Sequence, residues 1–134
     1  MLGRVPEWGR EHGPRGGVMS SVLIVVNTAP YGSEGPYSAF RLAEALALRD
    51  EHVEVFLMGD AVHAARAGQD PRGAHASLEQ MLMGLLDRAV DVSCCGACGT
   101  ARGLAEDDLV PGARAQTIHD LAAATARSDK VVSF

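Results

Sequence analysis

The chain has 134 residues, of which 47% are hydrophobic and 22% charged, a balance typical of one folded domain. Its formal net charge is −5 and its arginines are scattered, so it offers no basic surface for the phosphates of a nucleic acid. No apolar run approaches the roughly 18 to 20 residues that a membrane span needs, so we expect no membrane association.

The N-terminal segment differs in composition from the rest of the chain. Residues 1–19 mix five glycines and two prolines with several charges and show no hydrophobic period, which predicts a disordered extension. We therefore expect one domain over residues 20–134 and consider Met19 as a candidate start. No signal peptide is recognisable before Ser20, and three clustered cysteines suit a reducing compartment, so we expect a cytoplasmic protein.

From residue 21 onward, strand and helix patterns alternate. The continuous aliphatic run 22–26 predicts a central strand buried on both faces. A loop over 27–36 carries two glycines and two prolines, and its last proline suits the first turn of a helix over about 37–49. The alternating residues of 52–58 predict a second strand.

The same alternation continues to the C-terminus. The clearest helical signal is the spacing i, i+3, i+4, i+7, i+8 shown by Leu78, Met81, Leu82, Leu85 and Leu86. A last helix over 117–127 begins with a capping-box pattern, Thr117 followed by Asp120, and should bury one face made of Ile118, Leu121, Ala122 and Thr125. The remaining expected elements are a short helix at 61–67, a loop at 68–73, and short strands at 90–93, 113–115 and 131–132.

Strands that alternate with helices imply βαβ units with right-handed crossovers. We therefore predict an α/β fold of three layers, in which a mostly parallel sheet has helices on both faces.

Three cysteines crowd into the five positions 94–98, directly after the strand expected at 90–93. Open α/β sheets bind ligands at the carboxyl ends of their strands, so this turn is the expected site. Backbone amides at a helix start, together with Arg102 one helical turn past Cys98, would stabilise a thiolate there. The spacing Cys95-x-x-Cys98 also permits a local disulfide, whereas Cys94 fits better as a small buried hydrophobe.

A second candidate element is the loop that follows the first strand, because it leaves the same edge of a parallel sheet as the cysteines. Asn27 and Tyr31 are its main candidates for hydrogen bonds to a ligand, although a solvated connection explains the loop equally well. Asp60, after the second strand, is simplest as a turn former. The loop contains neither a GxGxxG nor a Walker sequence, so nucleotide binding has little support.

Three other readings of the cysteine turn remain open. Zinc bound by three thiolates and His63, His75 or His119 is disfavoured, because adjacent Cys94 and Cys95 would point in different directions and no second CxxC follows. A thiol–disulfide redox protein and a non-catalytic binding or assembly module are the other two. We expect no metal and no cofactor.

The stretch Cys95-Gly96-Ala97-Cys98-Gly99-Thr100-Ala101-Arg102-Gly103-Leu104 resembles the C-G-x-C-x-x-A-R-G-[LI] signature of DsrE/DsrF-like proteins. The resemblance extends over nearly all of residues 21–134 and implies a compact α/β subunit that assembles into trimers or hexamers. Some relatives carry sulfane sulfur as a cysteine persulfide between donor and acceptor proteins. By this resemblance Cys95 carries the persulfide, whereas relay subunits mostly lack a second cysteine at the position of Cys98. We expect Cys98 to resolve the persulfide by forming a disulfide, and Arg102 and the amides of the turn, Gly96 among them, to stabilise the negative sulfur. Whether such a chain is a sulfurtransferase or only a carrier stays open.

Overall fold

The structure is a computed structural model that describes residues 20–73 and 76–134. The predicted N-terminal extension over 1–19 and the candidate ligand His75 lie outside the described residues.

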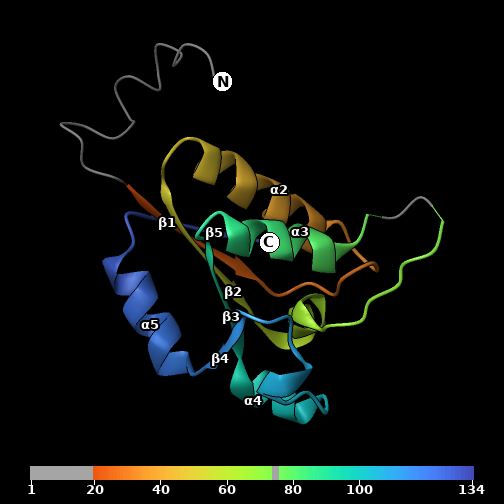
Figure 1. The fold of residues 1–134 in the computed structure, drawn as a ribbon. Coiled ribbons are helices and arrows are strands. Elements are labelled where there is room, and N and C mark those ends of the chain that lie inside the picture. Colours follow the sequence, from red (N-terminus) through yellow and green to blue (C-terminus); the bar gives the residue numbers. More distant parts are fainter. Residues whose placement is uncertain (1–19, 74–75) are drawn as a thin grey trace.

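Five parallel strands form one sheet in the order β4-β3-β2-β1-β5 (Figure 1). The strands are β1 (Ser21–Val26), β2 (His52–Leu57), β3 (Asp91–Cys95), β4 (Arg114–Gln116) and β5 (Lys130–Ser133). The predicted α/β fold with a parallel sheet is confirmed, and the expected strand at 113–115 is β4. Strand β3 is longer than predicted, because it continues through Cys94 and Cys95.

The direction of each crossover decides which face a helix covers. The helical elements are α2 (Gly35–Leu48), η1 (Gly59–Ala65), α3 (Leu78–Asp87), α4 (Gly96–Ala101), η2 (Glu106–Asp108) and α5 (Ile118–Arg127). The chain moves across the sheet from β1 to β4 and then returns to β5 beside β1. Right-handed crossovers therefore put α2 and α3 on one face, and α5, on the return crossover, on the other face (Figure 1).

The main core lies between the sheet and the α2–α3 layer. Alternate strand residues such as Ile24 and Val55 point into it, and Phe40 and Leu82 pack against them from the helices. A much smaller cluster on the opposite face consists of Leu23, Phe56, Cys95 and Ala124. The expected helical stripe at residues 78–86 is confirmed, since Leu78, Leu82 and Leu85 are buried.

The predicted buried face of α5 is wrong. Ile118 is 55% exposed and Ala122 and Thr125 are also exposed, whereas Ala124 is buried and Leu121 is half-buried. The helix contacts the sheet through the narrow Leu121–Ala124 stripe. Its start is as predicted, because the Thr117 hydroxyl accepts from the Asp120 amide at 3.2 Å and the Asp120 carboxylate accepts from the Thr117 amide at 2.9 Å.

Within the described part of the chain, no helix combines the length and apolar character needed to cross a bilayer.

The core arrangement predicts unequal effects for two neighbouring truncations in α3. Leu82→Ala removes a fully buried side chain, so we expect it to lower the free energy of unfolding by about 2 to 5 kcal/mol. Met83→Ala, one residue further along on the exposed side, serves as the control and should change it by less than about 0.5 kcal/mol. Urea unfolding followed by circular dichroism measures both values. Equal losses would contradict the assigned orientation of α3.

Candidate functional site at the end of strand β3

The cysteine turn lies where β3 passes directly into α4, with no residue between the two elements. Because consecutive strand residues point to opposite faces, Cys94 packs in the main core while Cys95 joins the small cluster on the α5 face. Cys98 lies in the first turn of α4 and touches both clusters. The expected divergence of the two adjacent cysteines is thus confirmed.

Cys94 is a structural cysteine. Its side chain is buried, and burial raises the pKa of its thiol to about 12, with a smaller contribution from the neighbouring Cys95. It therefore stays a neutral thiol at physiological pH and packs as a small apolar side chain.

Cys95 caps the helix that follows it. The Cys98 amide donates to its Sγ at 3.4 Å, and the Ala97 amide donates as well. Burial nevertheless raises the pKa of the Cys95 thiol, as does its hydrogen bond to the Cys98 sulfur. The residue is 7% exposed. The Cys95 thiol is therefore harder to ionise than an unperturbed cysteine.

Cys98 has the opposite balance. The pKa of its thiol is lowered, first by the hydrogen bond from Cys95, then by the Gly59 amide, and least by the positive charge of Arg102, while burial opposes these effects. Its side chain is half-buried rather than buried. Of the two thiols, Cys98 is therefore the one that ionises more readily.

Arg102 is anchored from two directions. Its Nη1 donates to the Cys98 carbonyl at 3.0 Å and its Nε donates to Asp60 Oδ1 at 2.9 Å. The guanidinium thus lies beside Cys98, as the one-turn spacing predicted, and Asp60 holds it there from the end of β2.

The sequence does not point to Gly59, and it places Asp60 at this edge with turn formation as its simplest role. Gly59, which follows β2, supplies an amide to the Cys98 sulfur, and Asp60 pairs with Arg102. Both follow a strand that is next to β3, so the rule that parallel strand ends share an edge was the available signal. Gly59 also has φ of +54°, a conformation that favours glycine.

The remaining predicted site residues, Asn27, Tyr31 and Gly96, do not all lie at the cysteines. The Asn27 carbonyl lies at the same edge, 3.8 Å from where a Cβ on Gly59 would stand. Tyr31 is directed elsewhere, because its hydroxyl donates to Gln69 and accepts from the Leu78 amide at 3.0 Å. Gly96 packs against β4, and the amides that reach the Cys95 sulfur belong to the two residues after it.

A cavity of about 180 Å³ adjoins the cysteines. Cys94 and Cys95 form part of its wall, and most of the remainder is aliphatic. Its lining also includes Val62, Leu104, Leu109, Ala115, Glu106 and Thr100. Its lining residues Cys94, Val62 and Leu109 belong to the main core, whereas the Cys95 side chain belongs to the small cluster on the α5 face, so the cavity lies beside the turn on the main-core side of the sheet.

Comparison with known proteins gives a consistent result. The profile of the DsrE/DsrF-like family matches residues 20–134. The chain belongs to this family. It is 39% identical to the protein YchN of Escherichia coli over 118 residues, which cover 87% of this chain and 100% of YchN. It is 40% identical to an uncharacterised protein of Methanocaldococcus jannaschii over 83% of this chain and 96% of that protein.

A more distant relative and two solved structures extend the comparison. A TusC homolog of Vibrio parahaemolyticus is 27% identical over 87% of this chain and 100% of its own length. The crystal structure of YchN superposes with a TM-score of 0.82 over 87% of this chain and 100% of YchN. A protein of unknown function from Methanobacterium thermoautotrophicum shares the fold, at 15% identity and a TM-score of 0.70, over 86% of this chain and 99% of its own. Together, the DsrE/DsrF-like family and the TusC homolog suggest a sulfur-relay family.

The position of Arg102 predicts a measurable effect on the Cys98 thiolate. Arg102→Gln removes the positive charge, so the pKa of Cys98 should rise and the midpoint of its alkylation profile should move to higher pH. Below that midpoint we expect iodoacetamide to react more slowly with the variant, because a smaller fraction of Cys98 is ionised. Peptide mass spectrometry across pH measures the rate. Arg72→Gln, on an exposed loop, is the control and should leave the profile unchanged.

Proposed function

We propose that this DsrE/DsrF-like protein carries sulfane sulfur as a persulfide on Cys95 and that Cys98 is the ionised partner that makes Cys95 reactive. The observation that carries the proposal is the geometry of the turn where β3 ends: the Cys95 sulfur caps α4 and accepts from the Cys98 amide at 3.4 Å, and Cys98 lies in the first turn of that helix. A thiolate within hydrogen-bond reach of a thiol can act as its base. The family assignment and the TusC-like relative support sulfur as the cargo.

The loading step balances without any further reactant. As a donor persulfide R–S–SH approaches, the Cys95 proton moves to the Cys98 thiolate, and the Cys95 sulfur bonds to the outer sulfur of the donor. The S–S bond of the donor breaks and R–S⁻ leaves. The products are the Cys95 persulfide, a neutral Cys98 thiol and the donor thiolate. An acceptor thiolate then attacks the outer sulfur, and Cys95 leaves as a thiolate.

The surroundings suit the loaded state. The Ala97 and Cys98 amides face the Cys95 sulfur, and the Arg102 charge lies on the other side of the pair. Hydrogen-bond donors and a nearby positive charge stabilise an anionic sulfur.

A thiol–disulfide reaction is the second candidate, and the same geometry favours it. After loading, the Cys98 thiol can lose its proton to solvent, and the resulting thiolate can attack the inner sulfur of the persulfide, forming a Cys95–Cys98 disulfide and releasing HS⁻. The sulfane sulfur is the electron acceptor in this step, so no outside oxidant is needed. Cys98 would then resolve the persulfide.

Intact mass after incubation with a persulfide donor tests the assignment. We expect a gain of one sulfur in the wild type and in Cys94→Ser, and no gain in Cys95→Ser. Cys98→Ser should load more slowly at neutral pH, because Cys95 loses its base, but should keep its sulfur longer. Absence of a gain in the wild type, or a gain that depends on Cys94 alone, would contradict the proposal. A gain that survives Cys95→Ser but not Cys98→Ser would place the carrier on Cys98.

We further propose that the protein acts in the cytoplasm as a homo-oligomer, trimeric or hexameric, and exchanges sulfur with donor and acceptor proteins. Support comes from the family resemblance and from apolar side chains that remain exposed on the single chain. Ile118 at the start of α5 and Val131 in β5 are 55% and 48% exposed. Val131 pairs with Leu23, so it points to the face that α5 only partly covers.

Light scattering after gel filtration tests the oligomer. The wild type should have three or six times the 14.1 kDa mass of the chain. The double variant Ile118→Asp/Val131→Asp should dissociate to smaller species, because charges would replace buried apolar contacts. Leu48→Asp, an equally exposed apolar position at the end of α2, is the matched control and should keep the wild-type mass. A wild-type mass of one chain would refute the oligomer.

A further inference from the structure

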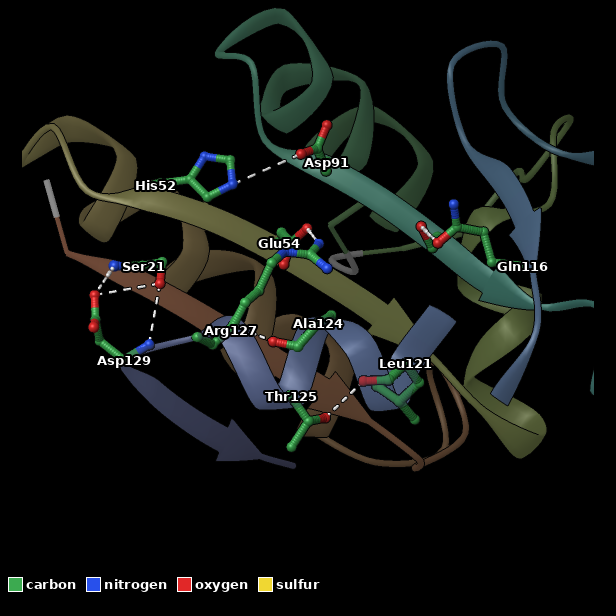
Figure 2. Close-up of polar contacts among 12 residues, drawn as sticks. Ser21, His52, Glu54, Asp91, Gln116, Leu121, Ala124, Thr125, Arg127 and Asp129 are labelled. Carbon is green, nitrogen blue, oxygen red and sulfur yellow. Dashed lines mark hydrogen bonds and ion pairs between the residues drawn. The ribbon is translucent and has the colours of Figure 1, made fainter. Parts of the chain in front are cut away.

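A second polar cluster lies at the opposite edge of the sheet, where β2 and β3 begin. His52 and Glu54 are two residues apart in β2 and so share one face, and the parallel register sets Asp91 of β3 opposite Glu54. Figure 2 shows the three side chains converging on the face that also carries α5. One ligand atom from each lies within 4.8 Å of the other two.

Among the described residues, the ion pairs of this cluster do not balance its charges. Two carboxylates directly opposite each other in a sheet repel, and Glu54 is additionally withdrawn from water, with only 14% of its side chain exposed. Arg127 of α5 pairs with Glu54 (Figure 2). His52 Nε2 lies 4.0 Å from Asp91 Oδ2. The two carboxylates and the one guanidinium together leave one negative charge.

We propose that His52, Glu54 and Asp91 bind one transition-metal ion, for which Zn²⁺ is the best match. One imidazole nitrogen with two carboxylate oxygens is a donor set that zinc accepts, whereas Ca²⁺ and Mg²⁺ prefer oxygen alone. Three protein ligands leave a fourth tetrahedral position for water or for a group from another molecule.

The cluster needs only a small contraction to reach zinc geometry. Tetrahedral ligands at about 2 Å from zinc lie about 3.3 Å apart, against separations within 4.8 Å here. The His52 and Asp91 side chains are 45% and 46% exposed, so they can adjust with little repacking, while Glu54 is held by its burial. Binding would also require Arg127 to release one oxygen of Glu54. The Arg127 side chain is 57% exposed, so it has room to move away.

This site is independent of the cysteines and of the proposed sulfur chemistry. The sequence predicts no metal and offers zinc ligands only as the thiolates with a histidine. It does not reveal this cluster, because the three ligands come from two strands that no local motif connects. His52 and Glu54 alone form an H-x-E pair that carries no specific signal. Only the β2–β3 register brings Asp91 to them.

Zinc titration of the full-length Cys95→Ser/Cys98→Ser variant tests the proposal, since that background removes the competing thiolates. Isothermal titration calorimetry should find one ion per chain, and thermal unfolding should move to higher temperature when zinc is present. Asp91→Asn and His52→Gln should each weaken binding at least about tenfold. His119→Gln and Asp107→Asn, exposed residues outside the cluster, are the matched controls and should bind as the parent does.

Two further measurements keep the outcome decisive. Arg127→Gln should tighten zinc binding, because the competing cation on Glu54 is gone. Circular dichroism verifies that each variant is folded, and His52→Gln, an exposed change at the first residue of a strand, remains informative if Asp91→Asn is not. Absence of zinc binding in the parent overturns the proposal. So does binding that a folded His52→Gln variant retains at full strength.

Discussion

The direct passage from β3 into α4 is the constraint on which the cysteine site depends. Because no residue intervenes, Cys95 is at once the last strand residue and the cap of the helix, and its sulfur accepts amide hydrogen bonds from the first turn. The strand pleat sends Cys94 into the core, where it cannot ionise at physiological pH. The helix then returns Cys98 to the same edge one turn later. The three neighbouring cysteines thereby lie in three different environments, which shift the pKa values of their thiols differently.

The strand order explains why the groups around Cys98 come from distant parts of the chain. Strands β1, β2 and β3 are neighbours and parallel, so Asn27, Gly59 and Cys95 leave the sheet at one edge. Arg102 reaches Cys98 from within its own helix, but its orientation depends on Asp60 after β2. Tertiary structure therefore contributes to the stabilisation of a thiolate at Cys98. An isolated CxxC turn would have its own backbone amides but would lack the Gly59 amide.

The sequence predicted the fold class, most helices and strands, and the location of the site. Hydrophobic periodicity identifies helices and strands from local sequence, and the rule that parallel strand ends share an edge locates the site. It did not predict which of the two thiols, Cys95 or Cys98, ionises more readily, since that depends on how the fold places Gly59 and Arg102 beside them. The buried face of α5 was also predicted wrongly. Four apolar or small residues suggested a wide buried stripe, but the helix packs on a partly polar sheet face through Leu121 and Ala124 alone among its described residues. Ile118 stays exposed on the single chain although the apolar period of the helix includes it.

The α5 face of β3 connects the two clusters along one strand. Asp91, Ser93 and Cys95 are every second residue of β3 and share that face. Between the other two, Ser93 Oγ donates a hydrogen bond to Gln116 Oε1 at 3.1 Å. At about 3.3 Å of rise per residue, Asp91 and Cys95 are about 13 Å apart. This exceeds the Debye length of about 8 Å at physiological salt, so a cation among His52, Glu54 and Asp91 would change the thiolate balance little. One strand can thus hold an anionic sulfur site at its end and a cation-binding cluster at its start without the two competing.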